Sequence, residues 1–255
     1  MKYLSILAIS LWMVACTQPP ETTSSATMPP VQQAQTLVDA AIEVHGGDAY
    51  QGQWVSFDFR DRHYRALLDS GRFRYERHTP TEDGMVVDRL TNDGLIRMVD
   101  GEVVVLADTM ADKYANSVNS VIYFALLPYF LNDGAVNKAY LGTSRLDSTD
   151  YHLIKVTFDQ EGGGKDFDDE FLYWIHPETY RMPYMAYSYA TDGGGLRFRS
   201  AYNLREVGGI RFQDYVNYKA DHQQFELEQL DSLFRVGALE ELSRIELESI
   251  EVVTE

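Results

Sequence analysis

The feature that most constrains the fold of this chain is an alternation of apolar and polar residues that repeats over many short segments. Successive residues of a β-strand point to opposite faces of a sheet, so a period of two predicts strands with one buried face. The segments are residues 54–60, 63–69, 72–78, 85–91, 95–99, 103–107, 151–159, 171–176, 185–190, 196–204 and 210–218, with 225–236 and 243–253 added as strands at the end of the chain. The sequence therefore predicts a mainly β protein.

Turn residues between the first segments indicate how the strands connect. Asn92-Asp93-Gly94 and Asp100-Gly101 supply residues that readily adopt positive φ, as tight hairpin turns require. The strands are therefore expected to run antiparallel. Because twisted open sheets rarely exceed about 10 strands, we expect a single curved antiparallel sheet of about 11–12 strands that forms an incompletely closed β-barrel.

An amphipathic helix is expected before the first strand. Residues 31–45 carry apolar side chains at helical spacing, after Pro30 and before the pair Gly46-Gly47. Proline favours the start of a helix and glycine its end. The sequence therefore predicts one amphipathic helix that opens the domain.

A second helix is expected in the middle of the chain. Residues 121–131 are apolar without interruption, which is shorter than the roughly 20 residues of a membrane span. Asn116 or Ser117 is expected to cap this helix, and Pro128 to kink or end it. A helix that is apolar all round is buried or covers an apolar surface, so we expect residues 118–131 to form a lid over the sheet.

The N-terminus reads as an export signal. Lys2 precedes an apolar stretch over residues 4–14, and Ala15 stands directly before Cys16. The tetrapeptide 13–16 resembles the lipobox of bacterial lipoproteins, in which the cysteine is acylated, although Met13 replaces the usual leucine.

Three parts of the chain follow from this signal. Residues 1–15 are expected to be a signal peptide, 16–30 an acylated cysteine with a disordered tether, and 31–255 a single β-rich half-barrel domain. Acyl chains on Cys16 are expected to hold the protein at the membrane, since each buried CH₂ contributes about 0.8 kcal/mol.

Charge and cysteine content exclude several classes of partner and site. The 39 acidic residues outnumber the 22 basic ones, and the formal net charge is −17. Such a surface repels the phosphate backbone, so no nucleic-acid partner is expected. The chain has a single cysteine, which excludes an internal disulfide and a thiolate metal cluster. We expect a monomer.

Arginines alternate with other residues on two predicted strands. Arg72 and Arg74 flank Phe73, and Arg197 and Arg199 flank Phe198. We expect these arginines on solvated faces, paired with the acids that are in excess.

A cation site is conceivable in the loop before residue 171. Asp166, Asp168 and Glu170 offer the carboxylate oxygens that Ca²⁺ prefers, beside the glycine triplet 162–164. Phe171, however, stands where an EF-hand loop requires glycine. We therefore expect no cofactor, with Ca²⁺ bound in this loop as the one alternative.

No catalytic signature is apparent elsewhere. The six histidines are scattered singly, and the sequence has no HExxH motif and no GxSxG elbow. No catalytic residue can be named, and we expect a binding protein rather than an enzyme.

Aromatic residues, 13% of the chain, are concentrated on the predicted strands and the central helix. Most of them are expected to fill a β-core, but some could line a cavity between sheet and helix that binds an apolar ligand. The candidates for this cavity are Val121, Phe124, Leu127, Phe130, Tyr173, Tyr187 and Tyr189.

Several blocks of the sequence resemble a known family. Residues 88–95, 118–133, 161–175, 192–203 and 208–218 resemble an uncharacterised lipoprotein family of Bacteroidota, a domain of unknown function. The layout of a half-barrel with a helical lid resembles the outer-membrane lipoprotein-carrier fold. No site residue and no activity follow from either resemblance.

Together these features favour a non-enzymatic, lipid-anchored protein of the cell envelope. It would bind an acyl chain or another lipid between sheet and helix, at the outer membrane and facing the periplasm. Two alternatives remain open: a cation-dependent periplasmic hydrolase that uses acids of the 159–170 loop, and an envelope scaffold protein.

Overall fold

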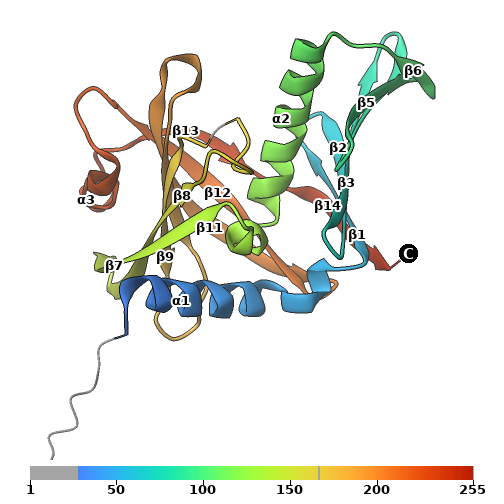
Figure 1. Ribbon diagram of the computed structural model, residues 1–255. Helices are drawn as coiled ribbons and strands as arrows, with labels where there is room; N and C mark the ends of the chain where they lie inside the picture. The colour runs from blue at the N-terminus through green and yellow to red at the C-terminus, as the bar shows by residue number, and fades with distance from the viewer. Residues whose placement is uncertain (1–27, 166, 255) are drawn as a thin grey trace, which may run out of the picture.

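The computed structural model describes residues 28–165 and 167–254, and these residues form two antiparallel sheets of seven strands each (Figure 1). The strand order in the first sheet is β14-β1-β2-β3-β4-β5-β6, and in the second it is β13-β12-β11-β10-β9-β8-β7. The first sheet comprises β1 (Gln53–Phe59), β2 (Arg62–Asp69), β3 (Arg72–Thr81), β4 (Gly84–Thr91), β5 (Gly94–Val99), β6 (Glu102–Val104) and β14 (Glu248–Thr254). The second comprises β7 (Val136–Leu146), β8 (Thr149–Phe158), β9 (Glu170–Ile175), β10 (Tyr184–Tyr189), β11 (Gly195–Val207), β12 (Ile210–Ala220) and β13 (Glu240–Ile245).

The mainly β, antiparallel and incompletely closed architecture is confirmed, but the division into sheets differs from the expectation. The predicted single sheet of 11–12 strands is two seven-stranded sheets. The chain leaves the first sheet after β6, passes through a long helix and starts a new edge at β7, so β6 and β7 never pair. Among the described strands after β7, only β14 returns to the first sheet, where it pairs with β1.

Three parts of the strand prediction are wrong. Residues 243–253 form parts of two strands, β13 and β14, which belong to different sheets. Residues 225–236 do not form a strand but the short helices η4 (Leu227–Gln229) and α3 (Leu230–Arg235). A capping box, in which Glu226 and Gln229 bond each other's backbone, starts this helical segment. Strand β7 was missed because its side chains are largely polar and a bulge between Tyr140 and Gly142 breaks its alternation.

The N-terminal helix is confirmed as α1 (Pro30–His45), followed by the short helix η1 (Gly47–Tyr50). It crosses the second sheet and packs against β7 and β12, which lie near opposite edges of that sheet (Figure 1). Ala34, Val38 and Ala41 on its inner face are fully buried. The apolar spacing seen in the sequence is therefore the stripe that docks the helix.

The central helix α2 (Asp108–Ala125) is longer than expected and begins earlier. Its N-cap position is Ala107, so the predicted caps Asn116 and Ser117 are wrong and lie inside the helix. The first turns of α2 are polar and gave no hydrophobic signal. The helix ends before Pro128, and the short helix η2 (Tyr129–Asn132) follows.

Helix α2 lies between the two sheets (Figure 1) and packs against β3, β4 and β5. Val118 and Ile122 on one of its faces are fully buried in a core formed with the first sheet. Leu127 and Leu131, which follow the helix, join a second core with α1 and β8–β9. In the described part of the chain, no helix is long and apolar enough to cross a membrane.

The second sheet is buried on both faces. One face packs against α1 and η2, and the other holds Trp174 and Phe198 against Leu227 and Leu230 of the C-terminal helical segment. Alternation in these strands therefore cannot distinguish an inner from an outer face.

His45 at the end of α1 is a buried titratable group. The side chain is 1% exposed, and its Nδ1 lies 2.8 Å from the carbonyl oxygen of Ala41. Burial lowers the pKa of His45 from 6.5 to about 4, although the hydrogen bond to Ala41 opposes this shift. Folding therefore favours the neutral ring, and its contribution to stability is complete above the unfolded pKa of 6.5 and is lost as the pH falls toward the folded value.

We expect the wild-type protein to lose on the order of 2 kcal/mol of unfolding free energy through this group between about pH 7 and about pH 5. His45→Phe keeps a ring of similar shape and removes the titration, so its loss over the same interval should be smaller by that amount. Urea unfolding at the two pH values measures both. Equal losses in the two proteins would show that His45 is not the responsible group.

Candidate functional site

A half-open groove of about 260 Å³ lies between α2 and strands β11–β13 of the second sheet. The end of β1 and the turn after it close one side. The lining residues are Phe59, Arg60, Ser120, Val121, Phe124, Ala125, Arg199, Gln213, Tyr215, Asn217, Ser243, Ile245 and Leu247. Its wall is mostly apolar, with a small number of polar groups, which is the usual composition of a small-molecule site.

The strand register places three polar groups of the groove in one row. Arg199 on β11 is paired with Asn217 on β12, and Asn217 is paired with Ser243 on β13. The next row on the same face lies two residues further along β12 and β13. It contains Tyr215 and Ile245, which are paired with each other. The groove thus has a polar row beside an apolar one, and α2 adds apolar side chains opposite them.

Arg199 is the most unusual residue of the polar row. It is 6% exposed, and its Nη2 donates a hydrogen bond of 3.0 Å to the hydroxyl of Tyr187. The guanidinium carbon lies 4.2 Å from the centre of the Phe124 ring. Its buried Nε has no hydrogen-bond partner, and no carboxylate forms an ion pair with it among the described residues. An arginine is always charged, so the groove contains a buried cation without a counter-ion.

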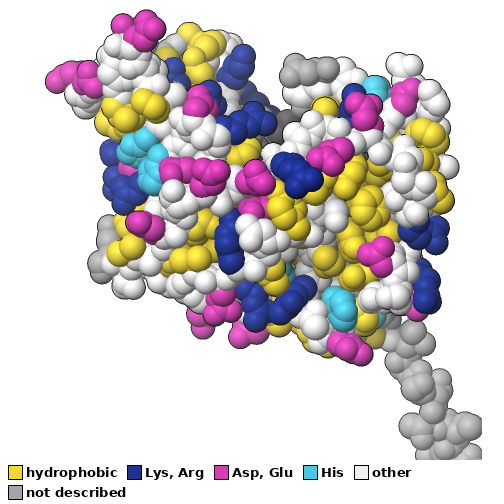
Figure 2. Space-filling model, turned by 180° about the vertical axis from the view of Figure 1, so that it is seen from behind, with side chains coloured by type: hydrophobic (Ala, Val, Ile, Leu, Met, Phe, Trp, Pro, Cys, Tyr) yellow, Lys and Arg dark blue, Asp and Glu magenta, His cyan; other side chains and the backbone are white. Residues whose placement is uncertain are grey.

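The net charge of the groove is opposite to that of the protein. The two charged lining residues are Arg60 and Arg199, whereas the whole chain carries −17. Elsewhere on the surface the two signs are mixed, and Figure 2 shows basic and acidic side chains next to each other over one face of the molecule. The groove therefore combines an apolar wall with positive charge.

Three of the predicted cavity residues lie at or beside the groove. Val121 and Phe124 line it from α2. Tyr187 lies behind Arg199, and its ring centre is 5.5 Å from that of Phe124.

The other four predicted cavity residues are placed elsewhere. Leu127 is buried in the core formed with α1, and Phe130 in the core formed with the first sheet. Tyr173 is fully buried on β9, and burial raises the pKa of its hydroxyl well above the ordinary value. Tyr189 accepts a hydrogen bond from Arg197 at the end of its strand.

The groove also contains residues that sequence reasoning missed or misplaced. Arg199 was expected on a solvated face and is buried instead, because the second sheet is covered on both faces. Arg197 is partly buried, with its Nη2 2.5 Å from the Tyr189 hydroxyl, whereas Arg74 follows the expectation and pairs with an acid. The alternation of arginine with Phe198 indicated that these side chains point to opposite faces of the strand. It did not indicate which part of the chain covers each face. Asn217 and Ser243 carried no sequence signal.

The predicted cation site stays a prediction. Asp166 lies outside the described residues, Asp168 is exposed, and Glu170 forms an ion pair of 2.9 Å with Lys155. In the described ranges, no three His, Cys, Asp or Glu side chains form a group that could bind a metal ion. Cys16, the predicted acylation site, also lies outside the described part of the chain.

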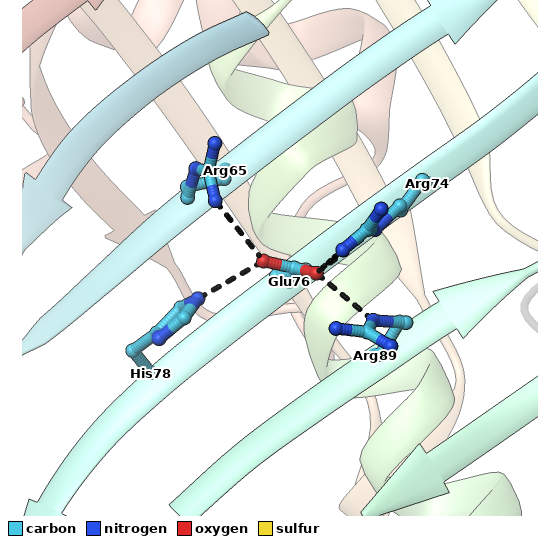
Figure 3. Close-up of polar contacts among 5 residues, drawn as sticks. All are labelled: Arg65, Arg74, Glu76, His78 and Arg89. Carbon is cyan, nitrogen blue, oxygen red and sulfur yellow. Dashed lines mark hydrogen bonds and ion pairs between the residues drawn. The ribbon is translucent and has the colours of Figure 1, made fainter. Parts of the chain in front are cut away.

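Two buried carboxylates organise arginines on the first sheet, one on each face. On the face away from α2, Glu76 is 2% exposed and contacts Arg65, Arg74, His78 and Arg89 (Figure 3). These hydrogen bonds, first that of His78 and then those of the arginines, hold the pKa of Glu76 far below its ordinary value. The cluster places several positive charges around one negative charge.

On the face toward α2, Asp88 is 1% exposed and is bound by Arg77 and Arg97. Burial alone raises the pKa of Asp88, but the hydrogen bonds from Arg97 and Arg77 outweigh it and lower the pKa. Nη1 of Arg77 also donates to Ser117 of α2 at 2.8 Å, so this ion-pair group joins the helix to the sheet. We interpret both clusters as structural, since each arginine there has a carboxylate partner.

Comparison with solved structures supports the description of the fold. The chain is similar to a DUF1329 family protein from Desulfovibrio piger, with a TM-score of 0.54 and 11% identity over 88% of this chain and 93% of that one. It is also similar to a LolA superfamily protein from Nitrosomonas europaea, with a TM-score of 0.45 and 12% identity over 74% of this chain and 86% of that one. A Vibrio parahaemolyticus domain provisionally described as an outer membrane lipoprotein-sorting protein gives a TM-score of 0.42 and 8% identity over 79% of this chain and 98% of that one. The first of these likenesses shows a shared fold.

Sequence comparison gives one further finding. No curated protein matches the chain. A family model described as a family of unknown function, DUF6503, matches residues 25–247.

Proposed function

The chain belongs to DUF6503, a family of unknown function, and we propose that it binds the apolar part of an amphiphile, an acyl chain or a lipid, in the groove between α2 and β11–β13. The observation that carries this proposal is the groove itself, half-open and walled largely by apolar side chains. Burying apolar surface is the main source of affinity for such a ligand, about 0.8 kcal/mol for each CH₂ removed from water.

The two faces of α2 support this function. Val118 and Ile122 pack into the core of the first sheet, whereas Val121 and Phe124 are only partly buried and face the groove. The helix is therefore held in place by one face and covers the groove with the other. A ligand could enter without displacing the packing that fixes the helix.

We propose binding rather than catalysis. The polar lining residues are arginines, hydroxyls and amides, and the groove as described has no histidine or carboxylate in its wall. General acid–base chemistry most often uses these two types of side chain. No observation on the described residues favours the hydrolase alternative.

The location proposed for this function is the outer membrane, with the domain facing the periplasm. Acyl chains on Cys16 would hold the domain there, on the tether over residues 16–30. An anchored domain of this kind meets its lipid ligand at the surface of the bilayer, where such ligands are concentrated.

The proposal is tested with the unacylated mature chain, residues 16–255 with Cys16→Ser. Titration with the fluorescent apolar probe N-phenyl-1-naphthylamine should give saturable binding with one site per chain, and dodecanol or dodecanoate should displace the probe. Mass spectrometry of an organic extract of the purified protein should detect a co-purified amphiphile. A folded protein that neither binds the probe saturably nor carries an extractable amphiphile would contradict the proposal.

A further inference from the structure

The charge on Arg199 is the strongest unexplained feature of the groove. Within the described residues, the only hydrogen bond from its guanidinium goes to a neutral tyrosine hydroxyl, and its Nε has none. Removing a guanidinium from water without an anion is unfavourable, because neither its charge nor its donors are fully compensated. The rings of Phe124 and Tyr187 lie 4.2 and 5.2 Å from the guanidinium carbon and compensate the charge only in part.

The neighbours of Arg199 in the polar row have spare hydrogen-bonding capacity too. The side-chain Nδ2 of Asn217 donates to the hydroxyl of Ser243 at 3.2 Å, and the buried Oδ1 of Asn217 has no partner among the described residues. Asn217 is 7% exposed. A cation without an ion pair and an amide oxygen without a hydrogen-bond donor thus lie side by side on β11 and β12, at one end of an apolar surface formed by Tyr215, Ile245 and Val121.

From this arrangement we infer that the ligand is a single-chain amphiphile with an anionic head, a carboxylate that forms an ion pair with Arg199 while its chain lies along the apolar row. The inference rests on the proposed function and specifies the ligand class of the same groove. A planar carboxylate can accept two parallel hydrogen bonds from a guanidinium, and its single charge matches the single buried cation. Arg60 at the rim adds positive charge that attracts an anion in a protein of net charge −17.

A neutral lipid fits this groove less well. An alcohol or an ester leaves the charge of Arg199 without a counter-ion and still requires its desolvation. A phosphate monoester also carries an anionic head, but its charge of nearly two exceeds that of the one buried cation. The matched ligands dodecanoate, dodecanol and dodecyl phosphate separate these possibilities, because they share one chain and differ only in the head.

The experiment measures displacement of N-phenyl-1-naphthylamine by these three ligands from the mature chain with Cys16→Ser. The pH is held at about 8 so that the carboxylic acid is ionised. We expect dodecanoate to bind at least about tenfold more tightly than dodecanol to the wild-type groove. Arg199→Met should reduce this ratio to near one, mainly by weakening the binding of dodecanoate, and Arg199→Lys should restore part of the preference. Arg197→Met, two residues away on the same strand, is the control and should keep the wild-type ratio.

The outcomes distinguish this inference from the proposed function. If none of the three ligands displaces the probe from the folded wild-type protein, the proposed function fails. If dodecanoate and dodecanol bind the wild type equally, or if the ratio is unchanged in Arg199→Met, a ligand still binds but the assignment of its head to Arg199 is overturned. Tighter binding of dodecyl phosphate than of dodecanoate would overturn the choice of a carboxylate. If Arg199→Met does not fold, the inference is still tested by the ratio of dodecanoate to dodecanol affinity in the wild type and by the change of that ratio in Arg199→Lys.

Discussion

Replacing Asp88 with asparagine is expected to lower the free energy of unfolding by about 3–5 kcal/mol. The Asp88 carboxylate accepts hydrogen bonds of 2.6 Å from Arg77 Nη2 and from Arg97 Nε. Its side chain is 1% exposed, and those of Arg77 and Arg97 are 5% and 17% exposed. Without the carboxylate, two largely buried guanidinium groups would face each other uncompensated. The loss would also release Arg77 from its place beside α2.

Urea unfolding of wild type and Asp88→Asn at neutral pH measures this effect. Asp150→Asn is the matched control, because its ion pair with Arg145 joins side chains that are 58% and 59% exposed. Exposed pairs of this kind contribute at most about 1 kcal/mol. Glu76→Gln should fall between them, at about 1–3 kcal/mol, since Arg65, Arg74 and Arg89 stay partly hydrated. An Asp88→Asn effect no larger than that of the control would contradict the prediction.

The same two carboxyl groups define how the fold responds to strong acid. Folding lowers the pKa of both Glu76 and Asp88, so each contributes stability that is complete above its unfolded value, near 4, and is lost as the pH falls below it. This acid transition lies below the interval in which His45 titrates. Wild type should therefore lose stability in two separable stages on acidification, and Asp88→Asn should show a reduced second stage.

Filling the groove with a large side chain is expected to weaken ligand binding strongly. Ser120 lies on the side of α2 that faces the groove, and its hydroxyl donates a hydrogen bond to the carbonyl oxygen of Ser117 within the helix. Ser120→Trp would place an indole in the space where the ligand is proposed to bind. We expect the affinity for N-phenyl-1-naphthylamine and dodecanoate to fall at least about tenfold, which corresponds to 1.4 kcal/mol.

The control for this prediction is one residue away. Asn119 is exposed on α2 and does not line the groove, so Asn119→Trp adds the same side chain outside the site. Both variants should unfold at similar urea concentrations. Equal affinities in Ser120→Trp and Asn119→Trp would show that the ligand binds elsewhere on the molecule.

Local patterns predicted most of the strands and the first helix correctly, because each depends on neighbouring residues in the chain. The alternation over residues 72–78, for example, follows directly from side chains that point to opposite faces of β3. The spacing over residues 31–45 likewise reflects the geometry of α1. The same local logic failed at residues 225–236, where Leu227, Leu230 and Phe234 fall at helical spacing but were read as part of a strand.

Within the candidate site, the sequence identified the helix and two of its groove-facing residues, Val121 and Phe124. The sequence predicted that Arg199 lies on a solvated face, because an arginine on an alternating strand is exposed in most sheets. The polar row also depends on the register of three strands, which joins Arg199 to Asn217 and Ser243 across some 44 residues of chain. No local pattern carries that information.

The sequence by itself thus determined that the chain is mainly β and antiparallel, that a helix precedes the strands and that an apolar helical segment interrupts them. These are properties of period and spacing, which a residue and its near neighbours fix. Only the tertiary structure decided that the strands divide into two sheets, that α2 lies between them and that a charged arginine is buried beside it. Burial depends on which surfaces the rest of the chain covers, and the second sheet is covered on both faces. The same alternation of arginine with apolar residues therefore places an arginine in solvent on one strand and in a groove on another.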